Sequence, residues 1–412
     1  MKPIKVLHIS SNGGVGGREK ILHSLLLKGK GDVQIMQSLY LKNPEGVNYR
    51  LILTEGIDVY SATKQNVLTN FLYHVRLFEN FNVLVFHFVD WYLFLAAALS
   101  GTRMIYVLSG IYLLTKKTAY DVVGIYINKI RSFFLNNIHT KPTEDLLAAI
   151  HSADTAVPNR KSFFRLLKRW FFILSVRILF YKVVVNSRYA YSSAIINYKI
   201  PHSKLMLIYN GSDEPSISKS AGEIRRELAI QPDEFVIGTV CRYDRRKRID
   251  RLLEGFRSLD AKSCFKLLIV GGGDELLEKE FKQYVNECGL ISKVIFTGLR
   301  TEVGNLINSM DLFVLPSDNE SFGLALVEAM LLKKTTVVFK DSGGPAEIIG
   351  KNSFGYIIDH PARLRDICLN LQDNPDLKEK MGRDAYRYVR DHFSTQKMYC
   401  EFRKLYLYDY LV

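Results

Sequence analysis

Short apolar segments alternate with helical segments along the whole chain. In the first half the apolar segments are residues 4–9, 33–39, 83–88, 103–108, 183–186 and 205–208. In the second half they are residues 235–241, 266–270, 294–297, 312–315 and 336–339. Strands that alternate with helices form parallel sheets covered by helices on both faces. We therefore predict the α/β class, with two doubly wound Rossmann-like domains; a chain of 412 residues suffices for two domains of about 200 residues each.

A polar region near Ser212 to Ser220 separates the two sets of segments. It lacks hydrophobic periodicity, which is typical of a linker between domains. We predict one domain at residues 1–212 and a second at residues 213–394. Ligands of such sheets bind at the carboxyl ends of the strands, so two facing domains would define one cleft.

The residues that indicate chemistry are concentrated in the segment 318–328, Asp-Asn-Glu-Ser-Phe-Gly-Leu-Ala-Leu-Val-Glu. Its two glutamates, Glu320 and Glu328, stand on either side of Gly323, which opens an apolar helix. The preceding apolar segment ends at Pro316, so we expect Glu320 on the strand-to-helix loop and Glu328 two turns into the helix. At 1.5 Å per helical residue the two carboxylates would be about 10 to 12 Å apart.

The expected start of this helix suits a diphosphate. The backbone amides of Phe322, Gly323 and Leu324 lie at the positive end of the helix dipole, where an anion is favoured. The span between the two carboxylates is close to that of a sugar, a diphosphate and a ribose placed end to end. The alternative is that both glutamates are ordinary solvated side chains.

This Glu-x7-Glu pattern resembles the donor site of retaining glycosyltransferases of family 4, which have the GT-B fold. Four further segments are similar to that family: Asn210 to Asp213, Gly238 to Asp250, Leu268 to Asp274 and Val294 to Leu299. The resemblance extends from Asn210 to the end of the chain, about half of the sequence. It implies two Rossmann-like domains facing across a cleft, with residues 1–212 on the acceptor side, residues 213–394 holding the nucleotide-sugar donor, and a helix at 395–412 crossing back to the first domain.

The resemblance also assigns roles to charged residues. Glu320, Arg242 and Lys247 become the catalytic residues, in which Glu320 binds the transferred sugar while Arg242 and Lys247 lower the charge that develops on the leaving diphosphate. Glu328 would accept hydrogen bonds from the ribose hydroxyls. The alternative for Arg242 and Lys247 is surface charge, because residues 242–248 are basic almost throughout.

A glycine-rich loop, residues 13–17, follows the first predicted strand. Glycines there let a phosphate or sugar approach the backbone closely, and the resemblance makes Gly14, Gly16 and Gly17 part of the donor-binding cleft floor. The alternative is dinucleotide binding, with Asp32 as the acid beyond the loop. The third glycine of the Gly-x-Gly-x-x-Gly pattern is missing, however, so we do not favour an oxidoreductase.

Two residues are expected on the acceptor or sugar side. His87 ends the strand at 83–88, where family members often carry a histidine that faces the cleft; a hydrogen-bonded histidine at a strand end is the alternative. At Ser109 many relatives have a histidine close to the transferred sugar. A hydroxyl cannot carry the positive charge of an imidazolium, so the resemblance implies that the sugar is held differently or that the enzyme is weak.

The expected donor is a UDP- or GDP-sugar, with its base near the backbone of Leu299 and Arg300. The sequence has no Asp-x-Asp triplet, so we predict neither a metal-bridged diphosphate nor any other cofactor. The resemblance implies transfer with retention of anomeric configuration through a front-side, dissociative route rather than a double displacement.

The excess of positive over negative charge is confined to the first half of the chain. Residues 1–213 hold 26 Lys and Arg against 12 Asp and Glu, a net charge of +14, whereas residues 214–412 hold 30 of each. Much of the excess lies in residues 160–177, where basic residues and aromatic residues share a predicted helix; the basic residues of one face are Lys161, Arg165, Lys168 and Arg169. Such a helix suits an anionic membrane surface. The alternative is a partly buried helix with a solvated basic edge.

Three function classes are less favoured. Nucleic-acid binding is not expected, because no recognition motif accompanies the basic residues. Membrane spanning is not expected, because the apolar stretches at 83–99 and 167–185 are both interrupted by charged residues. The first residues lack the apolar core and cleavage site of a secretion signal, and the five cysteines form no Cys-x-x-Cys pair.

We therefore expect a cytoplasmic enzyme, peripheral at the inner face of the membrane. Its acceptor would be a glycan or a lipid-linked molecule in cell-surface polysaccharide synthesis. The alternatives are a non-catalytic nucleotide-sugar-binding subunit that supports a partner glycosyltransferase, and a sugar-nucleotide epimerase on the same fold.

Overall fold

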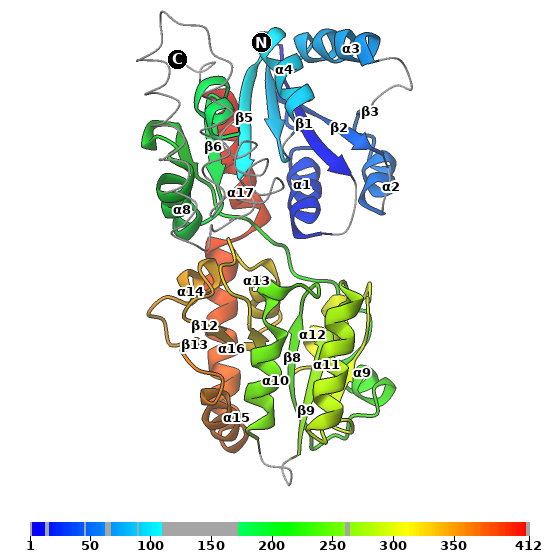
Figure 1. The fold of residues 1–412 in the computed structure, drawn as a ribbon, viewed down its shortest axis with the longest axis vertical. Helices are drawn as coiled ribbons and strands as arrows, with labels where there is room; N and C mark the ends of the chain where they lie inside the picture. The colour runs from blue at the N-terminus through cyan, green and yellow to red at the C-terminus, as the bar shows by residue number, and fades with distance from the viewer. Residues whose placement is uncertain are drawn as a thin grey trace, which may run out of the picture.

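A computed structural model describes residues 2–12, 16–44, 47–61, 67–88, 90–108, 172–259 and 264–408. Figure 1 shows two α/β units, one above the other, each built on its own sheet. Every strand pairing in both sheets is parallel. The predicted α/β class with two Rossmann-like sheets is confirmed.

Among the described residues, the first sheet contains seven strands in the order β3-β2-β1-β4-β5-β6-β7. Their bounds are β1 Ile4–Asn12, β2 Ile35–Asn43, β3 Val59–Ser61, β4 Val83–Phe86, β5 Arg103–Leu108, β6 Lys182–Val185 and β7 Leu205–Leu207. The helices around this sheet are α1 Gly17–Lys28, α2 Val47–Thr54, α3 Val67–Glu79, α4 Trp91–Leu99, α8 Arg188–Tyr198 and the short η1 His202–Lys204. The central strands are buried on both faces, which explains their continuous apolar sequences.

The second sheet contains six strands in the order β10-β9-β8-β11-β12-β13. Their bounds are β8 Phe235–Val240, β9 Phe265–Val270, β10 Val294–Phe296, β11 Leu312–Leu315, β12 Thr335–Phe339 and β13 Gly355–Ile358. Its helices are α9 Ala221–Glu227, η2 Arg245–Lys247, α10 Ile249–Arg257, α11 Glu275–Glu287, α12 Val303–Asn308, α13 Leu324–Leu331, α14 Gly344–Ile349, α15 Arg363–Asp373 and α16 Pro375–His392.

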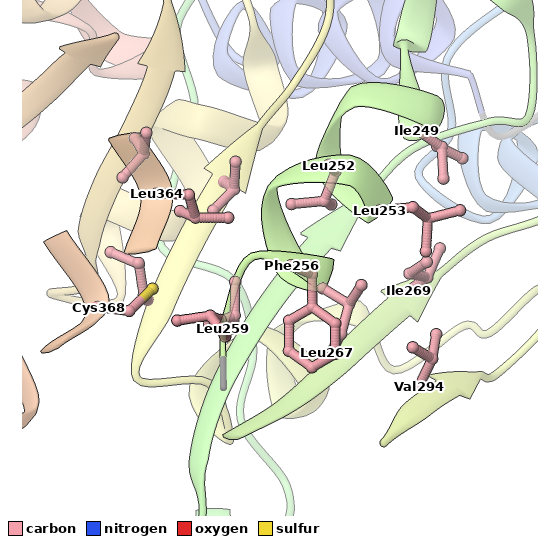
Figure 2. Packing of buried hydrophobic residues seen from close by; sticks show 14 of the residues in the cluster. Ile249, Leu252, Leu253, Phe256, Leu259, Leu267, Ile269, Val294, Leu364 and Cys368 are labelled. Atoms are coloured by element: carbon pink, nitrogen blue, oxygen red, sulfur yellow. The ribbon is translucent and has the colours of Figure 1, made fainter. Parts of the chain in front are cut away.

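The core of the second unit shows how α10 is fixed to the sheet. Figure 2 shows Leu252, Leu253 and Phe256 of α10 packed with residues of β9 and α15, and all three are buried. These residues repeat at a spacing of three to four, so one face of the helix is apolar. The residues just before α10, which include Lys247, are therefore carried on a firmly packed element.

The last helix, α17 Thr395–Leu407, lies against the first unit although it follows the second in sequence (Figure 1). Met398, Phe402 and Tyr406 join the apolar cluster beneath β1. Asp32 accepts hydrogen bonds from the Tyr399 hydroxyl and from Nε of Arg403, both at 2.7 Å. The exact limits of the predicted domains stay a prediction.

Two strands at sheet edges were not predicted. β3 has only three residues, all half-buried, and the half-buried β13 is the outermost strand of its sheet. An edge strand has one partner and less apolar surface to bury, so its sequence pattern is weaker.

Within the described ranges, none of the helices combines the length and the apolar character that a membrane span requires.

Candidate functional site

The loop from β11 to α13 ends in a backbone turn that requires glycine. Gly323 precedes α13 and has φ 90°, in the left-handed region. A Cβ at this position would lie 2.7 Å from Cγ of Pro345, which occupies the start of α14. Both the conformation and the close approach therefore exclude a side chain, and the chain turns sharply into α13. The first amides of α13 point out of the helix without intrahelical partners, as at every helix start.

Glu328 lies in α13, but nearer its start than predicted. Because α13 begins at Leu324, Glu328 is its fifth residue and lies just over one turn into the helix rather than two. Its side chain is buried, with 7% of the residue exposed. The carboxylate forms an ion pair with the ammonium group of Lys20, which comes from α1 of the first unit and is half-exposed. This ion pair therefore connects the second unit to the first.

Glu320 lies on the loop before α13, as predicted, and pairs with Lys247. Nζ of Lys247 donates to Oε2 of Glu320 at 2.6 Å, and both side chains are about one-fifth exposed. The backbone of Glu320 is fixed by the loop after β12: its amide donates to the Ser342 carbonyl at 2.8 Å, and its carbonyl accepts from the Gly344 amide at 2.9 Å. Two predicted catalytic residues, 73 positions apart, thus meet.

Arg242, the third predicted catalytic residue, is not part of this pair. It follows β8, its side chain is 71% exposed, and Nη2 donates to Oδ2 of Asp244 at 3.2 Å. Leu299 and Arg300 follow β10: Leu299 is exposed and Arg300 is paired with Glu302. These side chains lie at the carboxyl ends of strands in the second sheet, the edge where ligands of parallel sheets bind.

The glycine loop of the first unit approaches the start of α13. A Cβ at Gly17 would lie 3.9 Å from Cδ2 of Leu324, so the first turn of α1 is next to the first turn of α13. Gly16 is exposed and caps α1 without a side-chain hydrogen bond. Gly14 lies outside the described residues.

His87 is buried and paired with a second histidine. Its Nε2 lies 3.1 Å from Nδ1 of His8, whose Nε2 lies 2.8 Å from the side-chain oxygen of Gln37. Burial lowers the pKa of His8 to about 4 and that of His87 well below its usual value. Both rings are therefore neutral near pH 7. Ser109 and the basic residues between 109 and 171 lie outside the described residues.

A second group of contacts joins α8 of the first unit to the loop that carries Glu320. The Ser187 hydroxyl donates to the Ser321 carbonyl at 2.5 Å, and the Tyr189 hydroxyl donates to Oδ1 of Asn319 at 2.7 Å. Glu347 of α14 accepts from the amides of Arg188 and Tyr189 at 3.0 and 2.9 Å. A carboxylate of the second unit thus caps a helix of the first.

Sequence reasoning missed Lys20, Ser187, Tyr189 and the buried Arg251. Lys20 stands three residues after the glycine loop and Arg251 stands four residues after Lys247, one helical turn in each case. For Lys20 and Arg251, this helical spacing from a predicted site residue was the signal that could have indicated them. Nothing in the sequence indicates their partners, because Lys20 and Glu328 are 308 positions apart.

A hollow on the second unit does not coincide with these residues. It has a volume of about 710 Å³ and lies between η2, α10 and α11, where acidic and basic side chains mix and neither Glu320 nor Glu328 takes part. We place the candidate site at the start of α13 because the paired charges and the glycine turn meet there. In the described ranges, no cluster of three or more His, Cys, Asp or Glu residues could hold a metal ion.

Comparisons with known proteins agree with this fold. Residues 220–388 match the family described as glycosyl transferases group 1. The crystal structure of HepE from Anabaena, in complex with UDP and glucose, has a TM-score of 0.74 at 18% identity and covers 98% of this chain and 99% of that one. The chain has the GT-B fold.

The curated relatives match over about half of this chain. N-acetyl-alpha-D-glucosaminyl L-malate synthase of Bacillus anthracis is 27% identical over 51% of this chain and 55% of its own length. The O-antigen biosynthesis glycosyltransferase WclY of Escherichia coli is 23% identical over 56% of this chain and 63% of its own length. The chain therefore spans less than two thirds of the length of these curated relatives.

Proposed function

We propose that the chain is a retaining glycosyltransferase of family 4 that transfers a sugar from a nucleoside diphosphate donor. The observation that carries the proposal is the meeting of Lys247 and Glu320 beside the glycine turn into α13, with Glu328 on that same helix. An ammonium group, two carboxylates and free helix amides are the groups that a sugar, a ribose and a diphosphate require.

In the proposed donor complex each group has one task. The α13 amides bind the diphosphate, and Glu328 accepts hydrogen bonds from the ribose hydroxyls. Glu320 binds the sugar, while Lys247 and the exposed Arg242 stabilise the charge that grows on the leaving diphosphate. The exposure of Arg242 suits this task, because its guanidinium is held only by Asp244 among its described contacts and is accessible to a ligand.

The proposed chemistry is a front-side substitution. The bond from the anomeric carbon to the diphosphate oxygen breaks, the acceptor oxygen attacks from the same face, and the departing phosphate takes the acceptor proton. No enzyme carboxylate forms a covalent intermediate, and the protein acts through positioning and charge. We also propose that donor binding needs no metal ion, because Lys247, Arg242 and the helix amides supply the positive charge.

The proposed acceptor is a glycan or a lipid-linked molecule of a cell-surface polysaccharide. Support comes from relatives named for O-antigen, lipopolysaccharide core and poly(ribitol-phosphate) glycosylation. The proposed location is the inner face of the membrane. There the acceptor would meet the positively charged first unit.

Two measurements test the proposal. First, UDP, GDP and their sugars are screened for thermal stabilisation, because a ligand at 100 times its dissociation constant adds about 2.7 kcal/mol to the free energy of unfolding.

Second, Glu328→Ala and Lys247→Ala are each expected to lower turnover at least about tenfold, because each loses one charged contact in the transition state. Glu379→Ala and Lys380→Ala, on the exposed face of α16, are the matched controls.

Wild-type turnover in both site variants would show that the donor site is elsewhere. If the chain instead supports a partner enzyme without catalysis, it binds a nucleotide but neither hydrolyses nor transfers its sugar. Product analysis without acceptor separates the epimerase alternative, since an epimerase would return a changed nucleotide sugar.

A further inference from the structure

Arg251 is a buried cation that lies directly beneath the candidate site. It belongs to the first turn of α10, which begins two residues after Lys247, and only 7% of it is exposed. A buried guanidinium is costly unless its donors are satisfied. Its partners therefore show what the residue holds in place.

All the partners of Arg251 lie at the carboxyl ends of β11 and β12. Nε donates to the Pro316 carbonyl and Nη2 to the Ser317 carbonyl at 2.8 Å. Nη1 donates to both carboxylate oxygens of Asp341 at 2.9 and 3.0 Å. The guanidinium carbon lies 3.8 Å from the ring centre of Phe339, the last residue of β12.

These two strand ends also hold Glu320. The Asn319 amide donates to the Asp341 carbonyl at 3.0 Å, and the Glu320 amide donates to the neighbouring Ser342 carbonyl at 2.8 Å. The Asp318 amide donates to the Arg246 carbonyl at 2.9 Å, next to Lys247. Arg251 thus joins the element that carries Lys247 to both segments that fix Glu320.

We propose that Arg251 is a positioning residue that sets Glu320 against Lys247 for the sugar-transfer step. This inference rests on the proposed function. A planar guanidinium presents five donors in a fixed fork and here serves four acceptor atoms, whereas a lysine has three donors on one atom and cannot reach all of them. Lysine at position 251 would keep the positive charge, but it could not hold all four acceptor atoms in place.

The expected signature of Arg251→Lys is a split between turnover and binding. Because a displacement of about 1 Å costs up to about a hundredfold in rate, turnover is expected to fall at least about tenfold. The affinity for UDP or GDP is expected to change less than about threefold, because Glu328 and the helix amides are carried by α13, whose apolar residues belong to a different cluster from those of α10.

Arg225→Lys is the matched control. Arg225 is also partly buried, and it donates to the Ser309 and Glu234 carbonyls and to Oδ2 of Asp311, at the opposite end of β11. Both variants remove a forked arginine of a helix that holds one end of β11, so both should lose stability in thermal unfolding. Only Arg251→Lys is expected to lose turnover. Equal losses of turnover in the two variants would overturn the positioning role.

Asp341→Asn provides a second test should Arg251→Lys fail to fold. Asp341 is more than half exposed, so the fold tolerates the change, while Arg251 loses its charged partner. Turnover at least about threefold lower with unchanged nucleotide affinity supports the proposal, since one charged hydrogen bond is lost; unchanged turnover contradicts it.

A structural readout separates this inference from the proposed function. In a crystal structure of Arg251→Lys, the distance between Nζ of Lys247 and Oε2 of Glu320, now 2.6 Å, is expected to exceed the limit of about 4 Å for an ion pair. That distance does not depend on any assay. An unchanged distance would refute the role of Arg251 even if the chain transfers sugar, and a lengthened one would support it even if the donor differs.

Discussion

At the scale of single residues, the two glutamates of the candidate site pair with lysines that lie far from them in the sequence. Glu320 pairs with Lys247, and Glu328 pairs with Lys20. His8 in β1 and His87 after β4 differ from these ion pairs. Burial keeps both rings neutral, and they pair with each other. A neutral buried base titrates differently in the folded and unfolded chain, which makes the stability of the protein dependent on pH.

The sign of that dependence follows from His8. Its pKa is about 4 in the folded chain and 6.5 in an unfolded chain, so between these values only the unfolded chain binds the proton. The stability contribution is complete above pH 6.5 and is lost as the pH falls toward 4. At pH 5 the expected loss from His8 is about 2 kcal/mol relative to pH 8, measurable by urea unfolding.

His8→Gln should flatten this pH profile. The exposed His202 in η1 provides the comparison, because His202→Gln removes a histidine that remains solvated. A wild-type profile as flat as that of His8→Gln would mean that the buried pair is protonated in the folded protein.

At the scale of elements, the geometry of the site depends on how α13 starts. The glycine turn redirects the chain from β11 into the helix over a few residues, and Pro345 of α14 fills the space beside it. The loop therefore has little freedom. Glu320 precedes the turn and Glu328 follows it, so their separation is set by the turn.

Gly323→Ala is expected to destabilise the protein by about 2 kcal/mol, because alanine disfavours a φ of 90° and its Cβ would meet Pro345. Gly222→Ala in α9 is the control: its Cβ meets nothing within 4 Å, so a gain of about 0.5 kcal/mol is expected there. Chemical unfolding of both variants measures the difference. Equal effects would mean that the turn at Gly323 is not constrained.

Local elements were the part of the structure that sequence could predict. The apolar segments located most strands, and Gly323 with its flanking acids located the start of α13 to within one residue. The pairing of Lys20 with Glu328 could not be predicted, because it depends on how two separately folded units face each other. Arg251 was missed because a basic residue in a basic segment looks solvated, and only the tertiary structure shows its burial.

At the scale of the whole molecule, charge and exposed apolar surface are unevenly distributed. The net charge of +14 belongs to residues 1–213, while residues 214–412 are neutral overall. Residues 172–179 are helical, and Leu174, Arg177 and Ile178 are exposed there, next to the basic segment predicted at 160–177. An anionic bilayer favours such a combination of basic and apolar side chains.

Flotation with anionic vesicles is therefore expected to recover the protein at low salt and less of it as ionic strength rises. The double variant Leu174→Ser and Ile178→Ser should float less than wild type. Ile291→Ser, an equally exposed change in the neutral half, is the control. If the protein does not bind the anionic vesicles at moderate salt, the proposed location at the membrane is wrong.

The ion pair between Lys20 and Glu328 links two events that would otherwise be separate. Any ligand that donates hydrogen bonds to this carboxylate must either share it with the lysine of the opposite unit or release that lysine. The free energy of ligand binding and the free energy that holds the two units together are then coupled, and by linkage each changes the other by the same amount. Occupancy of the proposed nucleotide site would thus change how firmly the first unit is held against the second.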